Sequence, residues 1–231
     1  MIKVLQNWEE IGQCVQGLCR KGLPTHQSPE KNWDLYQLVQ VVQDLPPTAH
    51  IVDLGCAGSN ILKLLYALGY QNLQGIDLSI PILDRLRQGG RMWRNRSFRR
   101  PYRISRQNMT KTRFADGSFD LAVCVSVIEH GVEGSQFLAE ASRILKPGGR
   151  LFLTTDYWEV KIPVDATIRD FNLPWMICSR GEMEELIRTA KNHSLYLWEE
   201  CAIPDCGNTC VVWKQREYTF IGIVFRKEGG S

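Results

Sequence analysis

The feature that most constrains this chain is a short apolar run that ends in an acid and opens directly into a glycine turn. Residues 50–60 read His-Ile-Val-Asp-Leu-Gly-Cys-Ala-Gly-Ser-Asn, and a stretch with helical periodicity follows from 61 to 68. Twenty-two residues after Gly55, Asp77 closes a second short apolar run at 73–77. An acid at this spacing accepts hydrogen bonds from ribose hydroxyls in nucleotide-binding α/β folds. The pattern therefore predicts a site for an adenosine-containing cofactor.

Length and composition favour one globular domain, because 231 residues with 44% hydrophobic content can bury a substantial core without dividing. We expect a helical cap at 1–46, a cofactor-binding core at 48–157, an acceptor-site connection at 156–178, and a helix with a hairpin at 179–228. No run reaches the roughly 18 apolar residues of a membrane span, and the N-terminus lacks a signal-peptide pattern. A cytoplasmic protein without membrane contact is the expectation.

Apolar periodicity alternates between helical and strand-like segments, which predicts a doubly wound α/β fold with a mostly parallel sheet covered on both faces. Helices are expected at 6–20, 32–45, 60–68, 79–89, 133–145 and 179–191. Strands are expected at 50–54, 73–77, around 102–104, 119–125, 150–155, 195–198 and 218–225. The last two strands fit a closing antiparallel hairpin, so the sheet should have seven strands.

Cysteines and histidines do not form a recognisable metal motif. Cys201, Cys206 and Cys210, with His193 upstream, match no paired Cys-x-x-Cys spacing. We therefore expect no metal.

Basic charge is concentrated in one segment, where nine arginines lie between Arg85 and Arg106. Trp93, Phe98 and Tyr102 supply interleaved aromatic rings, so the segment could bind a nucleic acid through phosphate contacts and stacking. The rest of the chain carries no recognisable nucleic-acid module, which favours a solvated loop. A third interpretation is that one arginine contacts the cofactor or an anionic substrate.

Three further blocks follow the glycine turn in a fixed order. They are Phe-Ala-Asp-Gly-Ser-Phe-Asp-Leu at 114–121, Ser-Val-Ile-Glu-His at 126–130 and Leu-Lys-Pro-Gly-Gly-Arg-Leu at 145–151. Over residues 48–157 the chain resembles the class I S-adenosylmethionine-dependent methyltransferases, in their small-molecule branch. That family usually continues the first block as Gly-x-Gly-x-Gly, whereas this chain has Gly-Cys-Ala-Gly-Ser. The resemblance implies a Rossmann-like fold, S-adenosyl-L-methionine as cofactor and S-adenosyl-L-homocysteine as product.

The resemblance also implies roles for individual residues. The turn would face the methionine end of the cofactor, Asp77 the ribose, and Asn108 with its neighbour the adenine amino group. The expected cofactor-binding residues are Asp53, Gly55, Cys56, Ala57, Gly58, Ser59, Asn60, Asp77, Leu78, Ser79, Asn108, Met109 and Ser126.

Methyl transfer is an in-line displacement on a methyl group that the sulfonium already activates. The protein must hold the acceptor and exclude water, and a general base is needed only when the acceptor loses a proton. His130 is the first candidate for that base, because an unperturbed imidazole pKa near 6.5 leaves it neutral at neutral pH. Glu129 is the second catalytic candidate. Helix capping or surface packing is the alternative for both.

The acceptor site should come from segments outside the common core, namely residues 24–33 and 156–178. Long connections of this kind are usually functional. Aromatic walls with several carboxylates would suit an amine or a guanidine, or would hydrogen-bond the hydroxyls of a sugar-like molecule. The alternative is that the acids are solvated and the tryptophans pack a lid. The expected substrate-binding residues are His26, Trp33, Asp156, Tyr157, Trp158, Arg169, Asp170 and Trp175.

Three functions are compatible with these observations. The favoured one is a small-molecule methyltransferase of biosynthesis, acting on N or O of a polar, specialised metabolite. The second is an RNA or protein methyltransferase that docks through the arginine-rich segment, and the third is a non-catalytic binding protein with the cofactor fold. A dehydrogenase fits less well, because the third glycine of its fingerprint would fall at Asn60.

Overall fold

The computed structural model describes residues 1–57, 60–80 and 102–229. Outside the described residues lie Gly58, Ser59 and the arginines from Arg85 to Arg100. Most of the helix expected at 79–89 lies outside them as well.

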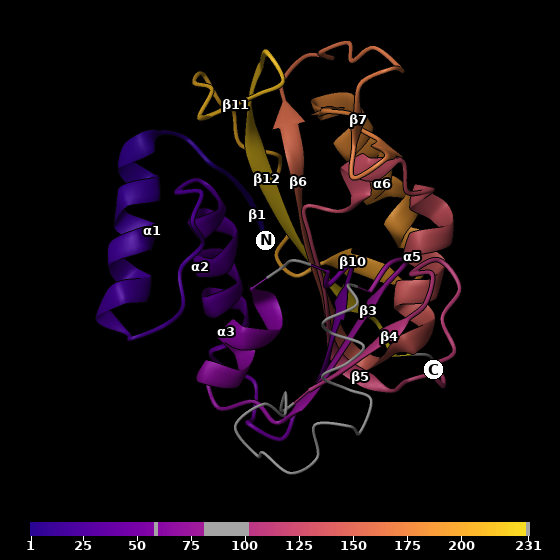
Figure 1. Cartoon of the computed structure of the whole chain (residues 1–231). Helices are drawn as coiled ribbons and strands as arrows, with labels where there is room; N and C mark the ends of the chain where they lie inside the picture. The colour runs from indigo at the N-terminus through magenta and orange to yellow at the C-terminus, as the bar shows by residue number, and fades with distance from the viewer. Residues whose placement is uncertain (58–59, 81–101, 230–231) are drawn as a thin grey trace.

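The centre of the fold is a sheet whose strands pair in the order β1-β12-β6-β5-β2-β3-β4 (Figure 1). Five of these strands run parallel to one another. They are β2 (His50–Leu54), β3 (Asn72–Asp77), β4 (Arg103–Arg106), β5 (Phe119–Val125) and β6 (Leu145–Trp158). Near-continuous apolar runs such as β5 are buried on both faces, as expected for central parallel strands. The α/β prediction is confirmed.

The strand count differs from the expected seven, because β12 (Arg216–Lys227) carries short partners along its outer edge. β10 (Leu195–Leu197), β1 (Ile2–Val4) and β11 (Val211–Trp213) pair with it in succession, all antiparallel. β9 (Cys178–Ser179) also joins β6, so the described residues form a ten-stranded sheet. Runs of two or three residues are too short to show a period of two, which is why periodicity missed β1, β9 and β11.

A separate two-stranded hairpin lies in the connection after β6. It consists of β7 (Arg169–Asp170) and β8 (Leu173–Pro174). The antiparallel pairing of the two late strands is confirmed for β10 and β12, but the direct hairpin neighbour of β12 is β11.

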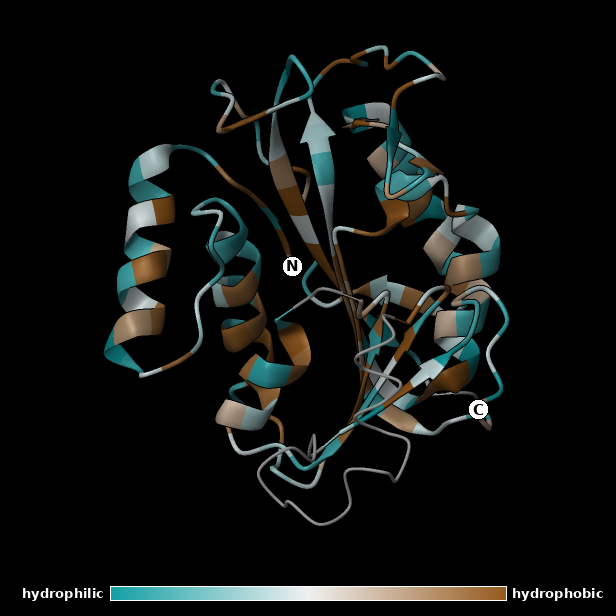
Figure 2. Ribbon diagram, in the orientation of Figure 1, coloured by the Kyte–Doolittle hydropathy of each residue, from teal (hydrophilic) through white to brown (hydrophobic). Residues whose placement is uncertain are grey.

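Helices cover both faces of the sheet. α1 (Trp8–Arg20), α2 (Lys31–Val42) and α3 (Ile61–Ala67) lie on one side, and α5 (Gly134–Ile144) and α6 (Arg180–Lys191) on the other (Figure 1). The apolar parts of the helices face the sheet in several places, as Figure 2 shows. The side chain and backbone of Ser179 form the predicted capping box with Glu182 at the start of α6.

Two large apolar clusters flank the central strands, one built around Phe137 and Leu153 and the other around Leu38 and Leu64. Together they fix the carboxyl ends of β2, β5 and β6 at one edge of the sheet. In the described part of the chain, no helix is both long and apolar enough to cross a membrane.

Candidate functional site

The glycine turn follows β2 directly. Gly55 has φ of 92°, and the N–H groups of Gly55 and Cys56 both donate to the carbonyl of Ile76, at 2.8 and 3.0 Å. A Cβ at Gly55 would lie 2.5 Å from Cγ2 of Val127. Only glycine satisfies both the left-handed backbone and this close approach.

Asp77, at the carboxyl end of β3, is tied to this turn. Its Oδ2 accepts from the N–H of Ala57 at 3.0 Å, and its Oδ1 accepts from the N–H of Ser79 at 2.9 Å. The carboxylate thus holds the turn and the segment after β3 together. A glycine cradle beside an acid of this kind fits the methionine and ribose parts of the expected cofactor.

The residues expected at the adenine lie beyond Asp77, toward the edge of the sheet formed by β4. The Oδ1 of Asn108 accepts from the N–H and the hydroxyl of Thr110, at 2.9 and 3.0 Å, so its amide oxygen is engaged in its own turn. Met109 is buried, while Leu78 is exposed, with its carbonyl accepting from Nε of Arg106 at 2.9 Å. Their contacts with adenine stay a prediction.

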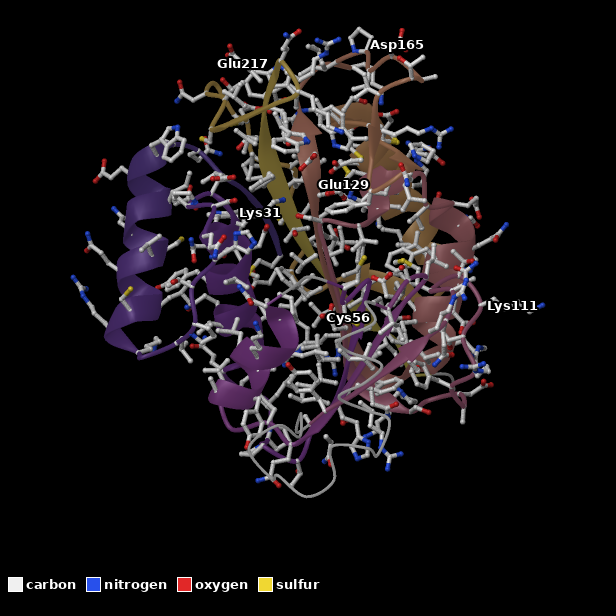
Figure 3. The ribbon with its side chains drawn as sticks, viewed as in Figure 1. Lys31, Cys56, Lys111, Glu129, Asp165 and Glu217 are labelled. Carbon is white, nitrogen blue, oxygen red and sulfur yellow. The ribbon has the colours of Figure 1, made fainter. Side chains whose placement is uncertain are left out.

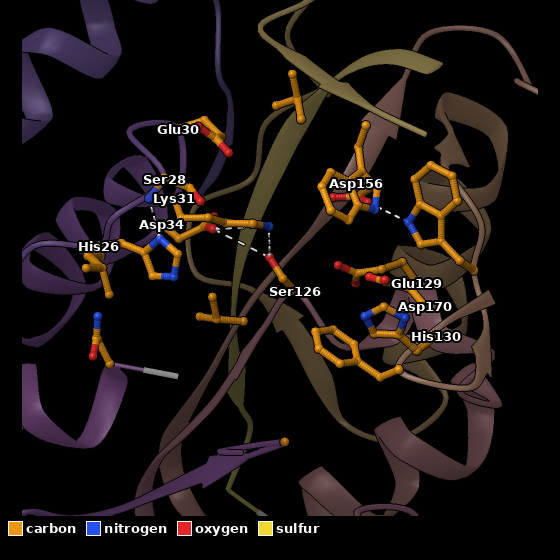
Figure 4. Close-up of a pocket in the computed structure, with 18 of the residues that line it drawn as sticks. His26, Ser28, Glu30, Lys31, Asp34, Ser126, Glu129, His130, Asp156 and Asp170 are labelled. Carbon is orange, nitrogen blue, oxygen red and sulfur yellow. Dashed lines mark hydrogen bonds and ion pairs between the residues drawn. The ribbon is translucent and has the colours of Figure 1, made fainter. Parts of the chain in front are cut away.

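A cavity of about 340 Å³ opens at the carboxyl ends of β2, β5 and β6 (Figure 4). Four of the expected cofactor residues line it, namely Gly55, Ala57, Asn60 and Ser126. Both catalytic candidates and half of the expected acceptor residues line it too, namely Glu129, His130, His26, Asp156, Asp170 and Trp175. The glycine turn and the two acceptor segments therefore meet in one space.

Other predicted residues are not brought to this cavity, and the periodicity of their elements explains two of them. Tyr157 follows Asp156 in β6, so the two side chains point to opposite faces, and Tyr157 is fully buried. Trp33 is fully buried in α2, where its indole N–H donates to Glu10 at 2.6 Å. The described residues that were predicted for the site but lie outside the cavity lining are Trp33, Tyr157, Trp158, Arg169, Asp53 and Cys56, together with Asp77, Leu78, Ser79, Asn108 and Met109 described above.

One wall of the cavity comes from the start of α2. The ammonium of Lys31 donates to Oγ of Ser126 at 2.7 Å, lies 3.9 Å from Oδ2 of Asp34, and sits 4.1 Å from the ring centroid of Phe220. Burial alone would lower the pKa of Lys31, but the nearby carboxyl groups of Asp34, Asp156 and Glu129 outweigh it, so the pKa is raised. Lys31 is therefore charged at neutral pH.

The opposite wall carries two buried carboxyl groups (Figures 3 and 4). Oε2 of Glu129 accepts from the Thr155 hydroxyl at 3.0 Å, and Oδ2 of Asp156 accepts from the Trp175 indole N–H at 2.8 Å. Glu129 is 2% exposed and Asp156 4%. Burial raises the pKa of both, and the mutual repulsion raises that of Glu129 further.

Two carboxylate oxygens in this cavity have no hydrogen-bond partner among the described residues. They are Oδ1 of Asp34 and Oδ1 of Asp156. Asp34 is 1% exposed, and burial raises its pKa to about 6 despite the opposing effect of Lys31. Buried oxygens without partners are uncommon in folded proteins, and here they line a cavity.

His130 lies on the same wall as Glu129. Its Nδ1 has no hydrogen-bond partner within the described part of the chain, and the Pro174 backbone lies close to the ring. In a neutral ring protonated at Nε2, this Nδ1 keeps a free lone pair. Burial lowers the pKa of His130 and outweighs the opposing effect of Asp170.

Sequence reasoning missed several lining residues. Lys31 and Asp34 form a polar pair three residues apart on a largely apolar helix, a signal that could have marked them. No comparable signal marked Phe171, Val212 and Trp213. Phe171 lies in the two-residue turn Phe171–Asn172, and Val212 and Trp213 precede the two-residue turn Lys214–Gln215. Both turns lack the usual glycine, so the sequence does not mark them as hairpins.

Comparison with known proteins agrees with this geometry. Residues 52–153 match the family described as "Methyltransferase domain". The chain is 32% identical over 108 residues to a ubiquinone biosynthesis O-methyltransferase of Xanthomonas oryzae pv. oryzae, covering 46% of this chain and 43% of that protein. It is 26% identical over 152 residues to the eEF1A lysine and N-terminal methyltransferase of Danio rerio, covering 61% and 21%. The match thus spans less than half of either relative.

Among solved structures, geranyl diphosphate methyltransferase in complex with S-adenosylmethionine has the same fold, with a TM-score of 0.62 at 17% identity over 90% of this chain and 94% of that one. The matched segment holds the glycine turn, Asp77 and the later motifs around one parallel core. Residues 52–153 therefore form a methyltransferase domain, and the fold built around them is that of the class I S-adenosylmethionine-dependent methyltransferases.

Proposed function

We propose that this methyltransferase acts on the nitrogen of a small amine. The observation that carries the proposal is the pair of unpartnered, buried carboxylate oxygens, on Asp34 and Asp156, in the cavity that the glycine turn also lines. The acceptor is a small molecule in this proposal, and no nucleic acid is involved.

The charge of the cavity favours a cationic acceptor. Its lining includes the five carboxyl groups of Glu30, Asp34, Glu129, Asp156 and Asp170, against the single ammonium of Lys31 among the described residues that line it. A buried carboxylate oxygen without a hydrogen-bond partner is costly, and a cation beside it offsets that cost. A neutral hydroxyl would bring no positive charge to the carboxyl groups that the single Lys31 does not neutralise.

The aromatic side chains of the cavity support the same acceptor. Trp175 and Tyr218 lie next to Asp156, and burial together with that carboxylate raises the pKa of Tyr218. Aromatic faces attract ammonium groups, more strongly where water is excluded.

Bound S-adenosylmethionine supplies an electrophilic methyl group on its sulfonium. Asp156 and Asp34 hold the acceptor as an ammonium ion, which must lose a proton before its lone pair can react. The free Nδ1 of His130 lies in the same cavity and is neutral at pH 7, so it can take this proton. A base in contact with the acceptor avoids release of the proton into a closed site.

The two relatives differ in their acceptors. One is an O-methyltransferase of ubiquinone biosynthesis, and the other is a methyltransferase of lysine and of an N-terminus. Oxygen methylation is therefore the second candidate, supported by the relative with the higher identity. Docking of an RNA or a protein through the arginine-rich segment is the third candidate, and of its nine arginines only Arg103 and Arg106 lie among the described residues.

Calorimetric titration with S-adenosylmethionine, S-adenosylhomocysteine and NAD, on the intact protein and on Asp77→Ala, tests the cofactor site. We expect the first two ligands to bind and NAD not to, with binding weakened by the substitution. Production of S-adenosylhomocysteine is then measured with matched acceptors, 2-phenylethylamine and 2-phenylethanol. Turnover of the alcohol alone would replace the amine by a hydroxyl acceptor, while turnover of neither with an intact cofactor site would favour a binding protein.

A further inference from the structure

The mouth of the cavity differs chemically from its interior. Phe171, Val212 and Trp213 line the same cavity as the carboxyl groups, yet they are 82%, 71% and 49% exposed. Large apolar side chains gathered at the rim of a polar site indicate contact with an apolar part of a ligand.

Two hairpins present these side chains. Phe171 lies in the two-residue turn between β7 and β8, and Trp213 is the last residue of β11, before the turn to β12. Phe171 has φ of 50°, a left-handed conformation that bulky side chains rarely adopt. Asn172 has φ of 62°, so both central residues of the turn are left-handed, as a two-residue hairpin turn requires. The turn therefore places Phe171 at the tip of its hairpin.

Polar contacts join the two hairpins across the mouth of the cavity. The ammonium of Lys214 lies 3.2 Å from Oδ1 of Asp170 and also donates to the carbonyl of Arg169. On the inner side, the ring of Phe171 meets the imidazole of His130 edge to face, with centroids 5.6 Å apart. The apolar rim is therefore held in place directly above a catalytic candidate and an acidic wall.

The cavity is shared by parts of both reactants. Its volume of about 340 Å³ lies at the lower end of ligand pockets, which range from roughly 300 to 1,000 Å³. The glycine turn lines part of it, so the methionine end of the cofactor shares this space. For an acceptor larger than its reacting group, the open mouth with its exposed apolar side chains offers a place for the remainder.

We propose that the acceptor is an amphiphilic amine, whose ammonium head lies between Asp34 and Asp156 and whose apolar body leaves the cavity between Phe171 and Trp213. This inference rests on the proposed amine methylation and adds the apolar body as the second recognition element. Polyamines and sugar amines lack that body, so they are excluded as preferred acceptors.

The test is calorimetric titration of n-propylamine, n-butylamine, n-pentylamine and n-hexylamine into protein saturated with S-adenosylhomocysteine. We expect affinity to rise by about two- to four-fold per methylene, the upper value being that of a fully buried methylene. The matched n-alkanols should bind at least about ten-fold more weakly than the amines, because they cannot offset the two carboxylates.

Two variants locate the apolar contact. In Trp213→Ala and Phe171→Ala the increase per methylene should fall toward one-fold, with the affinity of n-propylamine little changed. Trp8→Ala is the matched control, because Trp8 is a 57% exposed tryptophan on α1 that does not line the cavity. It should keep the slope of the unmodified protein.

Each outcome separates this inference from the function on which it rests. Amine binding without a length dependence, or a slope that survives in both rim variants, overturns the apolar body but leaves amine methylation intact. Binding of S-adenosylhomocysteine without any amine binding overturns both the head and the body. Failure to bind S-adenosylhomocysteine contradicts the cofactor assignment itself.

Discussion

The cofactor edge and the acceptor cavity are built in opposite ways, although both lie at the carboxyl ends of the strands. At the cofactor edge, Asp77 bonds the backbone N–H groups of Ala57 and Ser79, so its oxygens are engaged by the protein itself. In the acceptor cavity, Oδ1 of Asp34 and Oδ1 of Asp156 are buried without a partner among the described residues.

This difference shows that the two regions are prepared for their ligands in different ways. The cofactor edge is preorganised by its own backbone, since the glycine turn, β3 and Asp77 need only each other. The acceptor cavity has five carboxyl groups and one lysine among the described residues that line it, which favours a ligand that brings positive charge. Three predictions test this difference between the cofactor edge and the acceptor cavity.

The first prediction concerns the rigidity of the cofactor edge. Gly55→Ala should lower the free energy of unfolding by about 3–5 kcal/mol, because strain at positive φ adds to overpacking. The new Cβ would lie 2.5 Å from Val127. Chemical denaturation measures the effect.

Gly69→Ala is the matched control. Gly69 also has positive φ, at 97°, but nothing lies within 4 Å of the position that a Cβ would take there. Its loss should be about 1–2 kcal/mol. Equal losses in the two variants would show that the turn tolerates a side chain and that Gly55 is required only for its backbone angle.

The second prediction separates the two regions. Asp156→Asn should lower kcat/KM for an amine acceptor about 100-fold, because the charged partner of the ammonium is lost while the bond from Trp175 can remain. The affinity for S-adenosylhomocysteine should stay within about two-fold, since Asp156 does not contact the glycine turn.

Asp77→Ala should give the reverse order of effects, with S-adenosylhomocysteine binding about 30–100-fold weaker as charge-assisted hydrogen bonds are lost. Calorimetry measures both affinities. A large loss of S-adenosylhomocysteine affinity in Asp156→Asn would assign the acidic wall to the cofactor and contradict the amine site.

The third prediction uses the pKa of Asp34, which burial raises to about 6 from an ordinary value of 3.8. The folded state therefore disfavours the ionised form, and the penalty is fully present above about pH 7. It decreases as the pH falls through 6 and is absent below about pH 4.

Asp34→Asn should accordingly be more stable than the unmodified protein by about 3 kcal/mol at pH 8, since the pKa rises from 3.8 to about 6 and each pKa unit corresponds to about 1.36 kcal/mol, and nearly equally stable near pH 4. Urea denaturation at the two pH values measures this. Asp116→Asn is the control, because that side chain is 83% exposed and its ion pair with Arg143 is worth less than about 1 kcal/mol. Lower stability of Asp34→Asn at pH 8 would mean that attraction to Lys31 outweighs burial.

The amino-acid sequence predicted those parts of the molecule that are encoded in contiguous residues. β2 and β5 have the predicted bounds, at 50–54 and 119–125, because an apolar run flanked by turn residues carries its own signal. The capping box at Ser179 is equally local. The glycine turn and Asp77 belong to the same class, since their spacing follows from one strand, one helix and the next strand.

The tertiary structure alone decided which side chains share the acceptor cavity. Asp156 and Tyr157 are neighbours in sequence, but only Asp156 lines the cavity, because β6 alternates its faces. Lys31 and Asp34 reach the site because α2 packs against β6 and β12. Trp213 reaches it because β11 pairs with β12, and β11 is too short to carry a periodic signal. Long-range packing brings these segments together, and no local pattern records it.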